Sequence, residues 1–215
     1  MASIDYKKLY DIQDEVLTAV FAVEKEFYLT GGTCISRFYQ PKRYSDDLNF
    51  FANASNRYSF AVRRIKQALQ DKFPLLAEVE AKDFTRFRID GFLQVDFVND
   101  LAHRHNDIVI TDRGYLIDSV ENILANKLTA VIGRDNPKDV FDIYLIDKFY
   151  PVSWEAILVS AHRKAVFSDE DLLVRLRSFP ASLLSEIKLI DADFLKDFDA
   201  DFPRIVKAIA EVALK

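Results

Sequence analysis

The sequence predicts an α/β core followed by a helical C-terminal region. Up to about residue 112, short apolar runs typical of strands alternate with amphipathic segments, whereas beyond it apolar residues recur at helical spacing. The 215 residues include only 5 Gly and 6 Pro, which argues against a long flexible linker. We therefore expect an α/β domain over 1–112 and a helical region over 113–215 that closes one side of a cleft.

The first half of the chain is expected to alternate between helices and strands. Apolar residues three or four positions apart indicate helices at 9–23 and 58–69, and a third helix should begin at Thr33. Asp90-Gly91 indicates a type I′ hairpin turn, because both positions of that turn need positive φ. The expected strands lie at 27–29, 48–51, 75–81, 84–89, 92–98 and 108–111.

Helix start signals recur through the second half of the chain. Asp118, with Glu121 three residues later, is typical of a capping box. Further helices are expected after Asn136-Pro137, after Ser153, after Ser168 and over 202–214.

Charge and cysteine content limit the classes of function. A formal net charge of −5 argues against a protein that binds nucleic acid by charge alone. The single cysteine, Cys34, can form neither an internal disulfide nor a cysteine zinc site, which favours a reducing compartment. The N-terminal residues lack the apolar segment of a secretory signal, and no apolar run reaches the roughly 18 residues of a membrane span. We therefore expect a cytoplasmic protein with no membrane partner.

A pair of glycines lies between a predicted strand and a predicted helix. Gly31-Gly32 precedes Thr33, and glycine allows the main chain to approach a ligand closely. The unpaired N–H groups of a helix start can bind an anion such as phosphate. Taken alone, two glycines at such a place are more often only a turn.

Polar side chains alternate with apolar ones along two of the predicted strands. Asp47 and Asn49 should face one side of the sheet, while Leu48 and Phe50 face the other. Two oxygen-bearing side chains at this spacing can hold Mg²⁺ together with substrate phosphates. Asp96 lies in the middle of a later strand, where a carboxylate is costly to bury unless it is paired or bound to metal. The plain alternatives are a polar strand start and an exposed sheet face.

The helical half adds a second group of charged residues. Asp139 and Asp142 are three apart and share one helix face, and Lys127 and Arg134 are seven apart and share another. By themselves, these residues are typical of ion pairs on a protein surface.

Four sequence blocks and Asp96 occur in an order that resembles a known family. The blocks are YLTGGT at 28–33, RYSDDLNFF at 43–51, LANKLTA at 124–130 and KDVFDIY at 138–144. Together they resemble the nucleotidyltransferase toxins of AbiEii type, within the DNA-polymerase-β-like nucleotidyltransferase superfamily. The resemblance covers roughly residues 28–145. It implies a nucleotidyltransferase-like mixed sheet with flanking helices.

The resemblance also implies a set of site residues. The implied metal ligands are Asp47, Asn49 and Asp96, and the implied phosphate and nucleotide contacts are Gly31, Gly32, Thr33, Ser45 and Lys127. The implied catalytic set is Asp47, Asp96, Lys127 and Asp142, with Asp142 preferred to Asp139 for a supporting role. Mg²⁺ or Mn²⁺ would serve as cofactor and a nucleoside triphosphate as donor. Family members transfer nucleotides, in some cases to tRNA ends, and are encoded beside an antitoxin. The acceptor could be RNA, with tRNA as one candidate, a protein or a small molecule, and an antitoxin protein is a further expected partner.

One residue departs from the family pattern. The family has a second aspartate where this chain has Asn49, whose amide oxygen can bind Mg²⁺ but brings no charge. Asp46 would compensate only if the strand were bulged. The second hypothesis is therefore a nucleotide- or protein-binding homologue with impaired catalysis.

Two further interpretations of the first half stay open. Basic residues near the expected cleft could bind an acceptor, or only balance nearby acids: Arg37, Lys42, Arg43, Arg57, Arg63, Arg64, Arg86 and Arg88. A metal-dependent nuclease would use Glu80-Ala81-Lys82 with Asp47, but that tripeptide is common and leaves the glycines unexplained.

Overall fold

The computed structural model describes residues 4–214, and these fall into two compact units. The first unit comprises the chain up to residue 34 with 45–101 and 108–118, and the second comprises 35–44, 102–107 and the residues from 119 onward. The expectation of domains over 1–112 and 113–215 stays a prediction.

The first unit is built on a mixed sheet, as the family resemblance implies, and its seven strands are one more than the sequence predicts, because Leu116–Ile117 also forms a strand. Its order is β3-β4-β5-β2-β1-β7-β6. Strands β2 and β5 run parallel, as do β1 and β7, and the other neighbours are antiparallel. The strands are β1 (Tyr28–Thr30), β2 (Asp47–Asn53), β3 (Leu75–Glu80), β4 (Phe84–Ile89), β5 (Leu93–Asp100), β6 (Val109–Ile110) and β7 (Leu116–Ile117).

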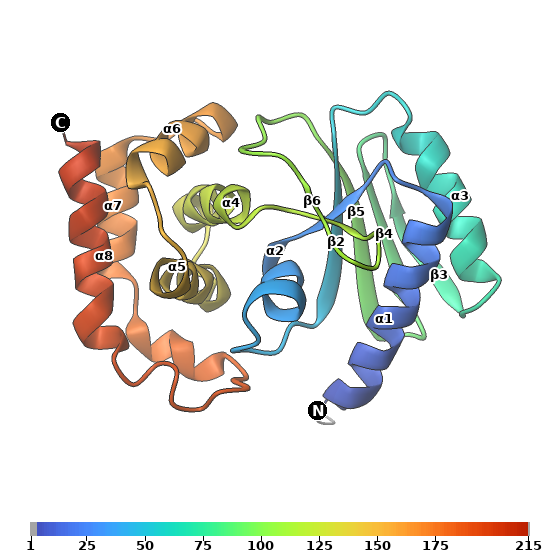
Figure 1. Cartoon of the computed structure of the whole chain (residues 1–215), viewed down its shortest axis with the longest axis horizontal. Helices are drawn as coiled ribbons and strands as arrows, with labels where there is room; N and C mark the ends of the chain where they lie inside the picture. The colour runs from blue at the N-terminus through green and yellow to red at the C-terminus, as the bar shows by residue number, and fades with distance from the viewer. Residues whose placement is uncertain (1–3, 215) are drawn as a thin grey trace. The chain divides into compact units, whose positions relative to one another are not determined.

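Two helices cover the apolar face of this sheet. Helices α1 (Tyr6–Val23) and α3 (Tyr58–Gln70) lie side by side against it (Figure 1). The ring of Phe21 on α1 lies 5.8 Å from that of Phe50 on β2, which stacks on Phe97 of β5 at 5.1 Å. This packing buries every second side chain of β2 and leaves the side chains between them for the opposite face.

The helix predicted from Thr33 begins two residues earlier in the structure. An α-helical turn, α2, spans Gly31–Cys34, and a π-helix, η1, spans Ile35–Tyr39. Gly31 has φ +71°, a left-handed conformation that glycine adopts without steric cost.

The second unit is helical, as the sequence predicts. Its longer helices are α4 (Val120–Gly133), α5 (Pro137–Phe149), α6 (Trp154–Lys164), α7 (Asp169–Ser178) and α8 (Phe198–Ala213), with a 3₁₀ turn η2 (Ala181–Glu186). The caps predicted at Asn136, Ser153 and Ser168 are confirmed, since each side chain accepts a main-chain N–H of the first turn.

Two helix starts differ from the sequence prediction. The cap of α4 is Ser119, whose hydroxyl accepts the N–H of Asn122, and not Asp118. Asp118 instead accepts the hydroxyl of Thr30 on β1 at 2.5 Å, a long-range contact that no local pattern shows. Helix α8 begins at Phe198, four residues before the predicted start at 202. The ring of Phe198 is buried, and its centroid lies 5.1 Å from that of Tyr144.

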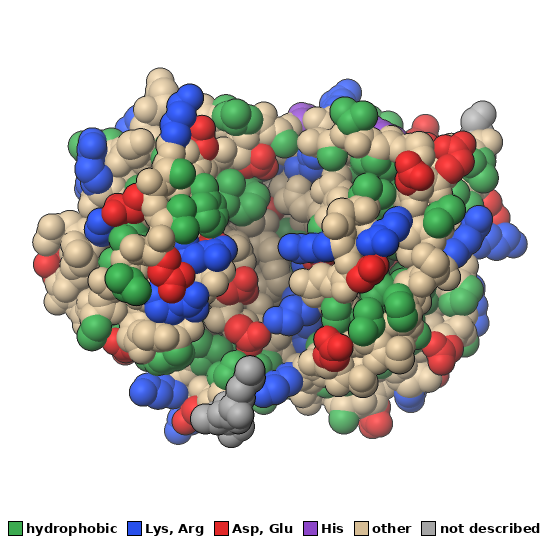
Figure 2. Space-filling model, turned by 180° about the vertical axis from the view of Figure 1, so that it is seen from behind, with side chains coloured by type: hydrophobic (Ala, Val, Ile, Leu, Met, Phe, Trp, Pro, Cys, Tyr) green, Lys and Arg blue, Asp and Glu red, His purple; other side chains and the backbone are tan. Residues whose placement is uncertain are grey.

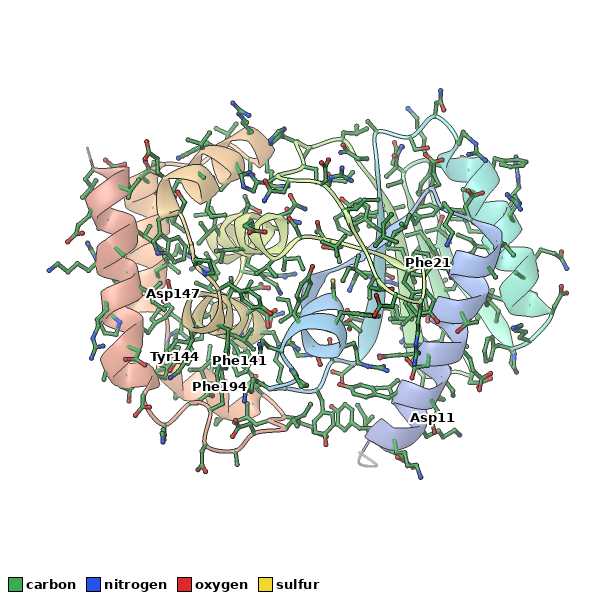
Figure 3. All side chains as sticks on the ribbon, viewed as in Figure 1. Asp11, Phe21, Phe141, Tyr144, Asp147 and Phe194 are labelled. Carbon is green, nitrogen blue, oxygen red and sulfur yellow. The ribbon has the colours of Figure 1, made fainter. Side chains whose placement is uncertain are left out.

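An aromatic cluster forms the core of the second unit. Phe141 and Tyr144 of α5 lie 5.2 and 5.4 Å from Phe194, measured between ring centroids (Figure 3). All three side chains are buried. The cluster therefore packs against the helix that carries the predicted aspartates, α5, at two positions one turn apart. No helix among residues 4–214 is long and apolar enough to cross a membrane.

Candidate active site

Strands β2 and β5 carry the three predicted metal ligands, and β1 lies beside β2. Asn49 is the register partner of Asp96 on the parallel strand β5 and of Thr30 on β1. Asp47 shares the face of Asn49, whose amide nitrogen donates to its carboxylate at 3.1 Å. The structure thus places the three predicted metal ligands on one face of neighbouring strands. Their roles as ligands stay predictions.

The alternation predicted for β2 is confirmed, and it excludes Asp46 from the group. Leu48 and Phe50 are fully buried, while Asp47 and Asn49 are half-buried on the other face. The pairing of β2 with β5 runs without a shift from residue 47 to residue 53, so β2 carries no bulge there. The carboxylate of Asp46 accepts the hydroxyl of Tyr6 at 2.8 Å.

Asp96 is buried and paired with an arginine. Its two oxygens accept from Nε and Nη2 of Arg86 at 2.8 and 2.7 Å, and Gln94 donates to it at 3.1 Å. The expectation that a buried carboxylate needs a partner is confirmed, and the exposed-face alternative is wrong. The hydrogen bonds to Asp96 raise the pKa of Arg86 above its ordinary value, and burial only partly opposes this. Arg86, expected in an acceptor-binding patch, therefore belongs to this group.

The turn between β4 and β5 explains why Arg86 meets Asp96. Asp90 and Gly91 both have positive φ, as predicted. The strand, however, resumes at Leu93, which pairs with Ile89, so the turn includes Phe92 as a third residue. This extra residue shifts the register by one position and places Arg86 opposite Asp96.

Hydrogen bonds connect the glycine turn to the start of β2. Thr33 Oγ1 lies 2.7 Å from Ser45 Oγ and also donates to the main-chain oxygen of Asp47. Thr33 and Ser45 are both buried. A Cβ built on Gly31 would lie 3.9 Å from Asn49 Nδ2, so the turn runs directly beside the polar face of β2. These buried hydroxyls hold the turn in place beside β2.

The predicted charged residues of the second unit form a buried cluster. Lys127 Nζ lies 2.8 Å from Asp139 Oδ1 and 2.7 Å from Asp142 Oδ2. Both aspartates are 0% exposed and Lys127 is 9% exposed. The prediction of surface ion pairs is therefore wrong. Helix spacing showed which residues share a face, but not that other helices cover it.

Two arginines complete the cluster. Arg43 is buried, and its Nε and Nη2 donate hydrogen bonds to the carboxylate of Asp142 at 2.8 and 2.9 Å. Arg134 is more exposed and reaches Asp139 through Nε at 2.7 Å. Sequence reasoning placed Arg43 in an acceptor-binding patch and missed this role. The sequence signal that could have indicated this role is that Arg43 is the first residue of the RYSDDLNFF block.

The pKa values of the cluster reflect burial opposed by opposite charges. Burial alone would lower the pKa of Lys127, but Asp142 and Asp139 outweigh it and raise that pKa. Burial alone would raise the pKa of Asp142, yet Arg43 and Lys127 hold it below its ordinary value. All these groups are therefore charged at neutral pH.

The donor types of the first unit fit a divalent cation. Asp47 and Asp96 supply carboxylate oxygens and Asn49 an amide oxygen, the donor types that Mg²⁺ and Mn²⁺ accept. Within residues 4–214, no group of three or more His, Cys, Asp or Glu side chains is arranged so that it could hold a metal ion by itself. Since the third donor is the neutral Asn49, two of the three donors are charged, and Arg86 pairs with one of those.

The structure does not bring together Glu80 and Asp47, as the nuclease hypothesis requires. Glu80 ends β3, and its carboxylate pairs with Lys66 of α3 at 2.8 Å. It therefore lies on the helix-covered side of the sheet, opposite to the side of Asp47.

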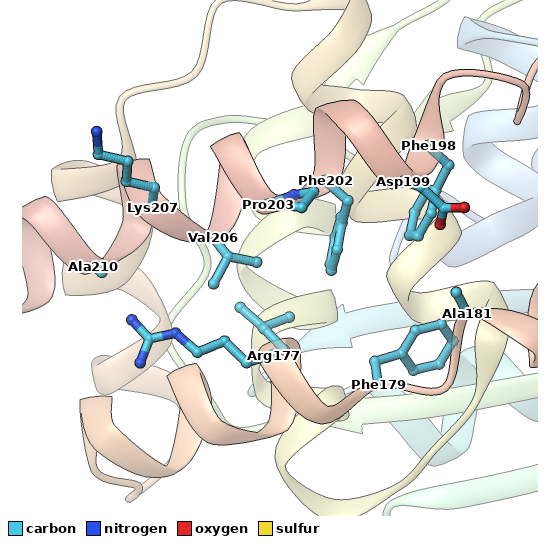
Figure 4. A pocket seen from close by; sticks show the side chains of 11 residues that line it. Arg177, Phe179, Ala181, Phe198, Asp199, Phe202, Pro203, Val206, Lys207 and Ala210 are labelled. Atoms are coloured by element: carbon cyan, nitrogen blue, oxygen red, sulfur yellow. The ribbon is translucent and has the colours of Figure 1, made fainter.

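A separate groove of about 370 Å³ runs between α7 and α8 in the second unit (Figure 4). Its apolar walls come from Leu176, Phe198 and Phe202, and it includes none of the predicted site residues.

Comparison with solved structures places this fold among the nucleotidyltransferases. JHP933 from Helicobacter pylori matches with a TM-score of 0.56 at 19% identity, over 100% of this chain and 92% of its own. MenT4, a nucleotidyltransferase toxin from Mycobacterium tuberculosis H37Rv, matches with a TM-score of 0.56 at 14% identity, over 96% and 93%. No curated protein sequence matches the chain.

The family itself is given by the sequence. Residues 16–214 match the model of the family described as "Nucleotidyl transferase AbiEii toxin, Type IV TA system". The chain belongs to this family of nucleotidyltransferase toxins, and the resemblance found in the four blocks is confirmed.

Proposed function

We propose that this nucleotidyltransferase moves a nucleoside monophosphate from a nucleoside triphosphate to an acceptor hydroxyl with the help of Mg²⁺ or Mn²⁺. One observation carries the proposal: Asp47, Asn49 and Asp96 lie on one face of β2 and β5, beside the glycine turn. A divalent cation held there would activate the hydroxyl and offset charge on the phosphates.

The remaining residues then take distinct parts. Gly31 and Gly32 expose main chain that a triphosphate can approach closely, and the buried Thr33 and Ser45 keep that turn in place. Lys127 is the proposed nucleotide contact in the helical half. Asp142 holds Lys127 charged and oriented, which makes Asp142 a positioning residue.

The proposed acceptor and partners follow from the family and from the charge of the chain. The family description names a toxin–antitoxin system, which supports a cognate antitoxin. For the acceptor we propose RNA, with tRNA as one candidate. Basic and acidic side chains are interspersed over the face in Figure 2, so this face as a whole does not attract RNA by charge. The acceptor would instead bind to a small group of basic side chains. The lone buried Cys34 supports a reducing, cytoplasmic setting.

Asn49 supports a second candidate function, a binding homologue with impaired catalysis. Its amide donates to Asp47 and adds no charge to the donor set. Restoring the aspartate separates the two candidates, because an active enzyme works without the change and an impaired one gains activity from it.

Label transfer tests both candidates. The wild type and Asn49→Asp would each be incubated with each of four α-labelled nucleoside triphosphates, total cellular RNA and protein, and Mg²⁺ or Mn²⁺. Labelled product from the wild type is expected, and it would identify donor and acceptor class together. Label only from Asn49→Asp would favour the impaired homologue, and label from neither protein would contradict the proposed transfer.

A further inference from the structure

Arg86 is the one residue of the candidate site that the metal hypothesis does not explain. It holds both oxygens of Asp96 in a fork, at 2.8 and 2.7 Å. Asp96 is 6% exposed, whereas the Arg86 side chain is 33% exposed. The arginine therefore covers a buried carboxylate from its solvent side.

This pairing changes the charge of the donor set. Asp47 carries one negative charge, Asn49 carries none, and the charge of Asp96 is balanced by Arg86. The set thus holds one net negative charge. A divalent cation is attracted less strongly to such a set, and it must also compete with a guanidinium for the oxygens of Asp96.

We propose that Arg86 is an internal counter-ion that competes with the divalent cation for Asp96, so that the site binds metal weakly on its own. This inference rests on the proposed function, since it concerns the same three donors. Phosphate oxygens present a guanidinium with the same fork geometry as a carboxylate. A bound triphosphate therefore offers Arg86 an alternative partner and makes Asp96 available to the cation. Metal and donor nucleotide would then bind together.

The neighbouring arginine on the same strand provides a matched control. Arg88 lies two residues from Arg86 on the same face of β4, and it grips Glu78 in the same fork at 2.8 and 3.0 Å. Glu78 is an exposed residue of β3 and is not one of the three donors. Replacing Arg88 thus removes the same charge and the same kind of fork while the fork between Arg86 and Asp96 stays in place. Near Asp96 it also removes a contact of 3.4 Å to Gln94.

Binding of Mn²⁺ alone, followed by electron paramagnetic resonance, tests the proposal. Arg86→Gln is expected to bind Mn²⁺ at least about tenfold more tightly than the wild type, because it frees Asp96 and removes a positive charge. Arg88→Gln is expected to stay within about twofold of the wild type. Arg86→Lys, which keeps the charge but cannot form the fork, should give a smaller gain than Arg86→Gln.

Two further measurements separate a metal effect from a structural one. Adding Asp96→Asn to Arg86→Gln should abolish the gain, because the gain requires the Asp96 carboxylate. Thermal unfolding checks that each variant folds, and Arg86→Lys carries the test should Arg86→Gln not fold. Unchanged Mn²⁺ affinity in the folded Arg86 variants, or an equal gain in Arg88→Gln, would overturn the proposal.

The readout is independent of catalysis. A gain in Mn²⁺ affinity without label transfer by any variant would support the role of Arg86 while contradicting the proposed function. Label transfer by the wild type without the gain would do the reverse.

Discussion

The two units each bury carboxylates against arginine or lysine, but they do so to different degrees. In the second unit, Asp142 forms ion pairs with Arg43 and Lys127. Asp139 forms ion pairs with Lys127 and Arg134. In the first unit, Arg86 pairs with Asp96, and no basic side chain among residues 4–214 forms an ion pair with Asp47. A closed network stabilises one arrangement of helices, whereas an incomplete one leaves oxygens available to a ligand. The comparison therefore agrees with the proposal that the first group holds the metal, and with the proposed role of Asp142 in positioning Lys127 in the second.

Removal of Asp47 should show the largest effect on activity. Asp47→Ala is expected to reduce nucleotide transfer by about 10³-fold or more, because it removes the one unneutralised carboxylate of the donor set. Its free energy of unfolding should change by less than about 0.5 kcal/mol, since Asp47 is half-buried and forms no ion pair with any residue from 4 to 214. Label transfer and urea unfolding measure the two effects. Equal activity of the variant and the wild type would contradict the site assignment.

Removal of Asp142 should show the largest effect on stability. Asp142→Ala leaves Arg43 and Lys127 buried with an unbalanced charge, which is expected to cost about 3–5 kcal/mol. Urea unfolding measures the loss, with Asp47→Ala as the control from the other unit. A loss below about 1 kcal/mol would show that this cluster is not a closed network.

Acid should weaken the second cluster in a defined direction. The pKa values of Asp139 and Asp142 lie below their ordinary value of 3.8 in the folded protein. The stability that they contribute is therefore present above pH 3.8 and is lost as the pH falls through the folded-state pKa values. The pKa of Lys127 lies above its ordinary value of 10.5, so its contribution is present below that pH and is lost as the pH rises further.

Urea unfolding across the acid range measures this dependence. Asp139→Asn should unfold with a smaller loss of stability between about pH 5 and pH 2 than the wild type, because one of the linked carboxylates is gone. An unchanged acid dependence would mean that other carboxylates dominate it.

The arginines of the second cluster should differ in their contribution. Arg134 has a side chain that is 58% exposed, so Arg134→Ala is expected to cost less than about 1 kcal/mol. Arg43→Ala removes a buried partner of Asp142 and should cost several times more. Arg134→Ala should therefore give the smallest effect in the series, and urea unfolding of both variants measures how far they differ. Equal losses would indicate that burial does not set the strength of these pairs.

The sequence by itself determined the alternation of polar and apolar side chains on β2 and β5. Strand periodicity is local, so Leu48 and Phe50 were correctly assigned to the core and Asp47 and Asn49 to the opposite face. The order of the four blocks determined the family, which the match over residues 16–214 confirms. Caps at Asn136, Ser153 and Ser168 were local as well, and were predicted correctly.

Only the tertiary structure decided which charges meet. Arg86 meets Asp96 because Phe92 adds a third residue to the turn, and a shift of one residue reverses which side chains share a face. Arg43 and Asp142 are 99 residues apart in the chain, and no periodicity links them. The burial of Lys127 depends on helices that cover α4, because a helix pattern shows which residues share a face and not what packs against that face.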